Sequence, residues 1–205
     1  MLRSTVSYKL PCCYKPGTDR IGKFVAKNQF TIELITNSLL SVPTRAYTSG
    51  DSMFIDDTEC GILCLSRSAN LANLYLTVAE IQHTMTREFM CRDVQHFHFF
   101  LILLKNESKP LGKLFEPIQS RSYHLETPCC LFATSCFMLT KNSVDPIIDN
   151  CDSNELDPLV VFAHFMTSGQ QSNIGIDRWD NLTVIKLFSA AMKMFKKDRE
   201  AENAN

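Results

Sequence analysis

Apolar residues recur at helical spacing in the segment that begins near residue 70. Five of them follow one another at intervals of three or four residues: Leu71, Leu74, Val78, Ile81 and Met85. This spacing places all five side chains on one face of an α-helix. The pattern therefore predicts an amphipathic helix over residues 71–85.

The next apolar segment, residues 94–104, has no clear period. It contains His96-Phe97-His98 and continues as an unbroken apolar run from Phe99 to Leu104. A run of this length fits a buried strand or a buried helix, and its spacing does not choose between them. Both interpretations stay open for this segment.

Three later apolar runs begin after a proline. They are residues 111–119 after Lys109-Pro110, residues 129–139 after Thr127-Pro128, and residues 159–166 after Asp157-Pro158. Thr and Asp favour the N-cap of a helix, and proline favours the position that follows it. Gly169 closes the third run as glycine closes many helices. We therefore expect three helices, with an exposed loop at the Asp-rich residues 141–158.

The last segment, residues 181–197, also has helical spacing. Its shared face carries the apolar residues Ile185, Phe188, Met192 and Phe195. Three lysines near its end, at positions 193, 196 and 197, suit the negative end of a helix dipole. Together the segments predict a mostly α fold of irregular stacked helical hairpins. If the apolar runs are strands instead, the alternative is a single α+β domain.

Two stretches within the expected helices share a local pattern. Leu114-Phe115 is followed three residues later by Ile118, and Val161-Phe162 is followed by Phe165. The stretches at residues 111–122 and 161–169 resemble the second helix of a pentatricopeptide-type repeat. That family consists of helical hairpins, mostly in mitochondria and chloroplasts, and the resemblance implies a role in RNA metabolism or at the organellar ribosome. Because the spacing differs from that of the family, no base-reading position is assigned to any residue.

Charge is distributed unevenly along the chain. The first 47 residues carry seven basic and two acidic side chains, a net charge of +5, although the whole chain has a net charge of −1. A basic, hydroxyl-rich and acid-poor segment that can form an amphipathic helix is typical of mitochondrial targeting. The acidic remainder argues against a broad phosphate-binding face but permits a local basic patch.

The basic segment ends in Pro43-Thr44-Arg45-Ala46-Tyr47-Thr48. These residues resemble the Arg-x-Tyr-Ser/Thr pattern at which mitochondrial presequences are trimmed. We therefore predict a processing site at Arg45, Tyr47 and Thr48. The predicted organisation is a mitochondrial targeting segment at residues 1–47 and a single globular helical domain at residues 48–205. The alternative is an ordinary N-terminal helix in a cytosolic or nuclear protein.

Cysteine is frequent in the chain, with nine residues, and three of these lie in one apolar run: Cys129, Cys130 and Cys136. Apolar neighbours favour the uncharged thiol, which is unreactive, so we expect buried structural cysteines and no catalytic residue. The histidines at positions 96, 98, 124 and 164 keep a Cys/His-dependent enzyme open as an alternative. The sequence has no paired Cys-x-x-Cys motif and no glycine-rich phosphate loop, so we expect neither metal nor cofactor.

These features predict a non-catalytic interaction or assembly factor of the mitochondrial matrix that serves organellar gene expression. We expect a protein partner, with RNA contacted through a larger complex. No apolar run approaches the ~18 residues of a membrane span, so no span is expected. A cytosolic or nuclear α+β protein-binding module is the first alternative, and the Cys/His-dependent enzyme is the second.

Overall fold

The computed structural model describes nine stretches of the chain: residues 7–50, 61–67, 76–82, 97–103, 116–118, 121–127, 135–150, 156–176 and 180–203. Seven strands lie within them: β1 (Tyr47–Ser49), β2 (Ile62–Ser66), β3 (Leu76–Gln82), β4 (Phe97–Leu103), β5 (Glu116–Ile118), β6 (Arg121–Thr127) and β7 (Ser135–Thr140). The helices are α1 (Asp19–Ala26), α2 (Gln29–Leu40), α5 (Lys141–Asn150), α6 (Pro158–Ser168), the short 3-10 helix η1 (Asn173–Gly175) and α7 (Leu182–Asn203).

The strands form one mixed sheet in the order β1-β2-β3-β4-β7-β6-β5. Its three central strands, β3, β4 and β7, are parallel, and Val78 pairs with Phe99, which pairs with Cys136. The outer strands are antiparallel. Parallel strands are usually covered on both faces and so read as continuous apolar runs. This explains why residues 94–104 have no period, and β4 settles their ambiguity in favour of a strand.

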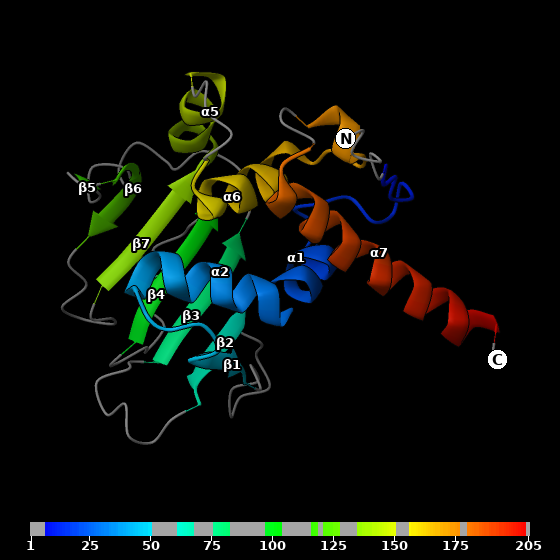
Figure 1. Ribbon diagram of the computed structural model, residues 1–205, viewed down its shortest axis with the longest axis horizontal. Helices are drawn as coiled ribbons and strands as arrows, with labels where there is room; N and C mark the ends of the chain where they lie inside the picture. Colours follow the sequence, from blue (N-terminus) through cyan, green and yellow to red (C-terminus); the bar gives the residue numbers. More distant parts are fainter. Residues whose placement is uncertain are drawn as a thin grey trace, which may run out of the picture.

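Helices α1, α2 and α6 lie over one face of the sheet, and α7 packs outside them (Figure 1). Helix α6 is buried on nearly every side, with Leu159, Phe162 and Phe165 fully inaccessible. Its ends follow the predicted signals: Asp157 accepts a hydrogen bond from the Leu159 N–H at 2.8 Å, and Gly169 has φ 62°. The predicted helices at residues 159–166 and 181–197 are therefore confirmed.

The N-terminal helices belong to the same core. Ile21, Val25, Ile32 and Ile35 on α1 and α2 are at most 1% exposed, and they join the cluster that includes α6. Two hydrogen bonds tie the preceding residues to the end of the chain: Tyr8 N–H to Asn173 Oδ1 and Leu10 N–H to the Gln171 carbonyl, both at 2.7 Å. The segment predicted for targeting thus supplies two helices of the folded domain.

Three predicted helices are wrong where the structure describes them. Residues 71–85 contain strand β3, residues 111–119 contain β5, and residues 129–139 lead into β7. Thr127, the expected N-cap, is the last residue of β6 and pairs with Cys136 of β7. Pairing with strands that are distant in the sequence determines the secondary structure of these segments. The local spacing of apolar residues carries no information about that pairing. The fold is therefore a mixture of helices and sheet, compatible with the alternative α+β interpretation and not plainly helical.

The Asp-rich segment at residues 141–158 also differs from the loop we expected. It begins with α5, which follows β7 without a connecting residue. Thr140 and Ser143 exchange hydrogen bonds, since the Ser143 N–H donates to Thr140 Oγ1 at 3.1 Å and the Thr140 N–H donates to Ser143 Oγ at 3.0 Å. This reciprocal capping satisfies two backbone donors at the start of α5.

Candidate functional site

The predicted processing residues lie at the start of the sheet. Arg45 is exposed and has a φ of 65°, Tyr47 is 1% exposed, and Thr48 is half-buried and pairs with Leu65. The Tyr47 carbonyl also accepts a hydrogen bond from Gln29 of α2 at 2.9 Å. In the folded chain Tyr47 is thus held by both the sheet and α2.

Tyr47 reaches a buried polar region between α2 and the sheet. Burial raises the pKa of its hydroxyl above the usual value of 10.0, the neighbouring Thr77 hydroxyl lowers the pKa, and the nearby Cys64 thiol raises it. Cys64 and Thr77 are fully buried and pair across β2 and β3. At neutral pH the tyrosine is therefore an uncharged structural group.

The cysteines and histidines of the enzyme alternative are spread over several elements. Cys136 is fully buried on β7, whereas Cys129, Cys130 and His96 lie outside the described residues. His98 pairs with Ser135, His124 lies on β6, and His164 lies on α6. Within the described stretches, no three His, Cys, Asp or Glu residues gather closely enough to hold a metal ion.

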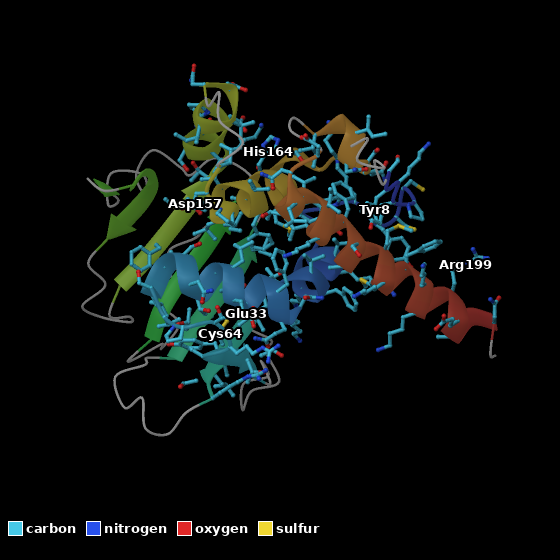
Figure 2. All side chains as sticks on the ribbon, in the orientation of Figure 1. Tyr8, Glu33, Cys64, Asp157, His164 and Arg199 are labelled. Carbon is cyan, nitrogen blue, oxygen red and sulfur yellow. The ribbon has the colours of Figure 1, made fainter. Side chains whose placement is uncertain are left out.

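One histidine faces a carboxylate. His164 Nδ1 on α6 lies 3.9 Å from Asp145 Oδ1 on α5, with side-chain exposures of 13% and 33% (Figure 2). Asp145 also pairs with Lys141 of its own helix. Since α5 and α6 pack together, the pair links two neighbouring helices and is best explained as a structural contact.

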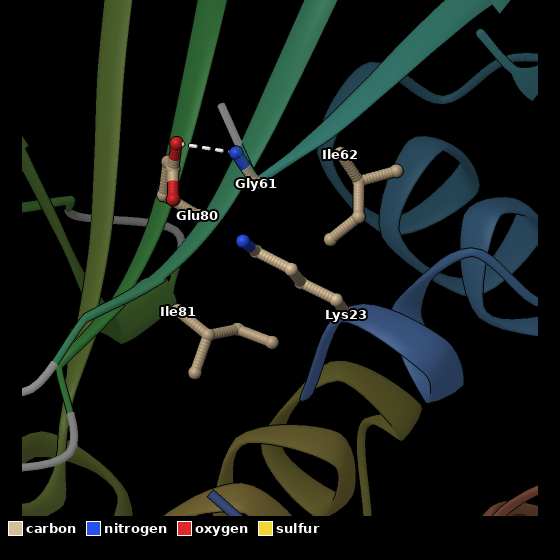
Figure 3. Close-up of a pocket in the computed structure, with 5 residues that line it drawn as sticks. All are labelled: Lys23, Gly61, Ile62, Glu80 and Ile81. Carbon is tan, nitrogen blue, oxygen red and sulfur yellow. Dashed lines mark hydrogen bonds between the residues drawn. The ribbon is translucent and has the colours of Figure 1, made fainter. Parts of the chain in front are cut away.

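A small polar cavity lies where α1 meets the sheet. Glu80, only 6% exposed, accepts a hydrogen bond from the Gly61 N–H, and the Lys23 side chain runs between Ile62 and Ile81 towards them (Figure 3). A Cβ at Gly61 would lie 2.3 Å from the Ala79 carbonyl oxygen, so only glycine allows this approach. The cavity has a volume of about 10 Å³, roughly the space of one water molecule. It is too small for a substrate.

The exposed cations of α7 form the surface with the clearest binding chemistry. Five basic residues lie on this helix: Lys186, Lys193, Lys196, Lys197 and Arg199. All five are exposed, and Arg199 lies on the part of α7 that projects beyond the sheet (Figure 2). The basic N-terminal segment packs against this helix through α1. Two basic segments from opposite ends of the sequence therefore come together.

The positions of the lysines on α7 indicated only a favourable interaction with the helix dipole, so this surface was not predicted from the sequence. The available signal was the presence of basic residues at both ends of the chain, but only the fold shows that the two ends meet. Comparison of the chain with protein-family models, with curated proteins and with solved structures found no match. No helix in the described stretches has the length and apolar character needed to cross a membrane.

Proposed function

We propose that this protein is a non-catalytic interaction or assembly factor of the mitochondrial matrix, acting in organellar gene expression. The observation that carries the proposal is the C-terminal half of α7, which projects from the body of the domain and presents exposed cations (Figure 1). A projecting charged helix on a compact body is suited to docking into a larger assembly.

The N-terminal segment supports the mitochondrial part of the proposal. Arg20 on α1 and Lys27 at its C-cap are exposed, while Ile21 and Val25 of α1 are buried, so the helix has a basic face and an apolar face. This is the character of a targeting helix. In an unfolded chain a receptor can bind the apolar face, which packs into the core once the chain folds.

Fractionation of the native cell tests the proposal. We expect the endogenous protein to be protected from protease inside intact mitochondria and to sediment with a large complex after gentle lysis. A variant in which Arg3, Lys9, Lys15 and Arg20 are replaced by Gln should stay in the cytosol. Recovery of the native protein in the cytosol, or as a free monomer in the matrix, would contradict the proposal.

The N-terminal residue of the native protein tests the processing prediction separately. A chain that begins at Tyr47 or Thr48 would support trimming after Ala46 or Tyr47, and it would lack α1 and α2. A matrix protein that retains residue 20 would instead support targeting by an uncleaved segment. Mass spectrometry of the N-terminal peptide distinguishes these two results.

A further inference from the structure

Two adjacent cysteines near the start of the chain are exposed. Cys12 and Cys13 both lie at the surface, whereas Cys64 and Cys136 are fully buried in the sheet. Cysteine is among the residue types most often buried in proteins, so a buried thiol is explained by packing alone. Two neighbouring thiols in contact with water lack that explanation. Among the described cysteines, they are the ones that a dissolved reagent can reach.

The two cysteines occupy the centre of a tight turn. The Tyr14 N–H donates a hydrogen bond to the Pro11 carbonyl at 2.9 Å, so Cys12 and Cys13 are the central residues of a β-turn. Glycine, proline, asparagine, aspartate and serine dominate such turns, because they suit its backbone or its hydrogen bonds. Cysteine offers neither advantage. The demands of the turn therefore do not account for the two thiols.

Contacts on both sides hold the turn in place. Leu10 is 2% exposed, and its N–H donates to the Gln171 carbonyl at 2.7 Å. The Gln171 side-chain amide donates in turn to the Pro11 carbonyl at 3.2 Å. The ring of Tyr14, a residue that is 7% exposed, meets the Phe195 ring of α7 edge to face, with centres 5.2 Å apart. Anchored residues thus flank the cysteines, which are presented on a supported turn.

The surroundings of the turn are basic. Lys9 and Lys15 are exposed on either side of the cysteines. Residues 7–20 contain three basic residues and one acidic residue, a formal charge of +2. Positive charge on a surface raises the local concentration of anionic reagents. Glutathione is such a reagent at neutral pH, because its carboxylates outnumber its ammonium group.

We propose that the Cys12–Cys13 turn is a site of reversible mixed-disulfide formation with small anionic thiols of the glutathione class. A thiolate at Cys12 or Cys13 attacks one sulfur of glutathione disulfide, whose S–S bond breaks as a new S–S bond joins the cysteine to glutathione. The second glutathione leaves as a thiolate and takes up the proton that the cysteine lost. The cysteine sulfur is oxidised and the departing sulfur is reduced, so glutathione disulfide is the oxidant. Attack by free glutathione reverses the step.

A disulfide between Cys12 and Cys13 themselves is disfavoured. Their peptide bond is trans, and consecutive Cα atoms are then about 3.8 Å apart. Disulfides usually join Cα atoms that are about 4.4–6.8 Å apart, and departures from this range store strain. The neighbouring thiol is therefore a poor competitor for the glutathione adduct. The adduct persists until an external thiol removes it.

A metal ion fits the two cysteines less well than a thiol does. Structural zinc sites use four ligands, most often from cysteine and histidine. Within the part of the chain that the structure describes, no three His, Cys, Asp or Glu residues gather closely enough to hold a metal ion. The inference goes beyond the proposed function, because it concerns another surface and needs no macromolecular partner.

Mass mapping of the full chain tests the site. The reduced, folded protein is exposed to glutathione disulfide, and its peptides are analysed by mass spectrometry. We expect one glutathionyl group on Cys12 or Cys13, and its removal by an excess of glutathione. Cys64 and Cys136 should react at least about 100-fold more slowly, because a buried thiol reacts only from opened states of the protein. In urea the four thiols should react at similar rates.

A charge-removing variant tests the class of reagent. The double variant Lys9→Gln, Lys15→Gln should react about threefold more slowly with glutathione disulfide, measured relative to the neutral bis(hydroxyethyl) disulfide. The ratio of the two rates isolates the effect of charge from any general change in thiol reactivity. Lys141→Gln, which removes an exposed cation from α5, is the matched control and should leave the ratio unchanged. Unchanged circular dichroism verifies that each variant is folded.

The chemical outcomes decide the inference. A reversible adduct on Cys12 or Cys13 that forms faster than adducts on Cys64 and Cys136 would support it. Absence of that adduct, a turn peptide that has lost two hydrogens instead, or equal rates at the buried cysteines of the folded chain would overturn it. An unchanged ratio of rates in the lysine variant would overturn the assignment to an anionic reagent.

The native protein separates this inference from the proposed function. A mature chain that begins at Tyr47 or Thr48 would overturn the inference, because it would lack the site, while supporting the predicted processing. A cytosolic protein that carries the adduct on Cys12 or Cys13 would support the inference and contradict the proposed function. The N-terminal peptide of the native protein, analysed without reducing agent, distinguishes these results.

Discussion

The same sequence pattern occurs at the start of helix α6 and at the end of strand β6, but the two segments have different structures. Each has a polar residue, a proline and then an apolar run: Asp157-Pro158 before residues 159–166 and Thr127-Pro128 before residues 129–139. Asp157 caps α6, whereas Thr127 is the last residue of β6 and pairs with Cys136. The first run is closed by Gly169 at φ 62°, and the second has no glycine after it. A helix-start signal is therefore reliable when the matching end signal is also present.

The largest expected effect concerns the contrast between the helical layer and the sheet. Deleting residues 1–46 removes α1 and α2 and four core isoleucine and valine side chains: Ile21, Val25, Ile32 and Ile35. At about 1.5–3 kcal/mol each, their burial contributes about 6–12 kcal/mol, comparable to the whole stability of a typical domain. We expect the truncated chain to show no cooperative urea transition. A transition like that of the full chain would show that the sheet is stable without these helices.

A paired substitution compares the two layers within the core. Phe165 on α6 is fully buried and its ring meets Phe188 edge to face at 5.1 Å, whereas Phe137 on β7 is only partly buried. Phe165→Ala should cost about 3–5 kcal/mol of unfolding free energy. Phe137→Ala should cost about half as much, because less apolar surface leaves water at that position. Urea unfolding measures both, and equal losses would contradict the assignment of the core centre to α6.

The difference between Asp157, which caps a helix, and Thr127, which ends a strand, predicts a smaller effect on the free energy of unfolding. Asp157→Ala should cost about 1 kcal/mol because the Leu159 N–H loses its acceptor. Asp157→Asn retains a side-chain oxygen and serves as the control, with a loss well below that of alanine. Thr127→Ala should leave the helical signal in circular dichroism unchanged, because Thr127 belongs to β6 and pairs with Cys136 of β7. A helical loss in the Thr127 variant would restore the original helix prediction for the run that follows.

The smallest expected effect is a pH dependence of stability that arises from Tyr47, which lies between α2 and the sheet. Burial raises the pKa of Tyr47, so the folded state holds the phenol proton more tightly than the unfolded state does. The stability that this provides is fully present below about pH 10 and is lost as the pH rises through the folded-state pKa. The wild type should therefore lose more unfolding free energy than Tyr47→Phe between about pH 9 and about pH 11. Parallel pH profiles for the two proteins would show that Tyr47 does not titrate differently on folding.

Helices with complete local start and end signals are predictable from this sequence, whereas strands that depend on distant partners are not. Asp157, Pro158 and Gly169 fixed α6 because caps act within one turn of the chain. Val78 and Ile81 also fit helical spacing, but Val78 pairs with Phe99, a contact that no local window contains. Spacing alone therefore assigned residues 71–85 to the wrong element.

The candidate site was less predictable than the fold for the same physical reason. Arg20 and Arg199 are 179 positions apart in the sequence, and they lie over the rings of Tyr14 and Phe195, which meet only after folding. The basic character of the N-terminal segment was visible, and so were the lysines of α7. What composition could not provide was the packing of α1 against α7, which brings the two ends of the chain together.

The hydrogen bonds that tie Tyr8 to Asn173 and Leu10 to Gln171 also determine when the N-terminal residues can reach their folded positions. The Leu10 bond needs residue 171 and the Tyr8 bond needs residue 173, so neither can form until most of the chain has been synthesised. Contacts between such distant positions also slow folding. Throughout this delay the N-terminal segment has not yet made its native bonds. Any molecule that bound this segment would compete with folding, and slower folding would give it more time to bind.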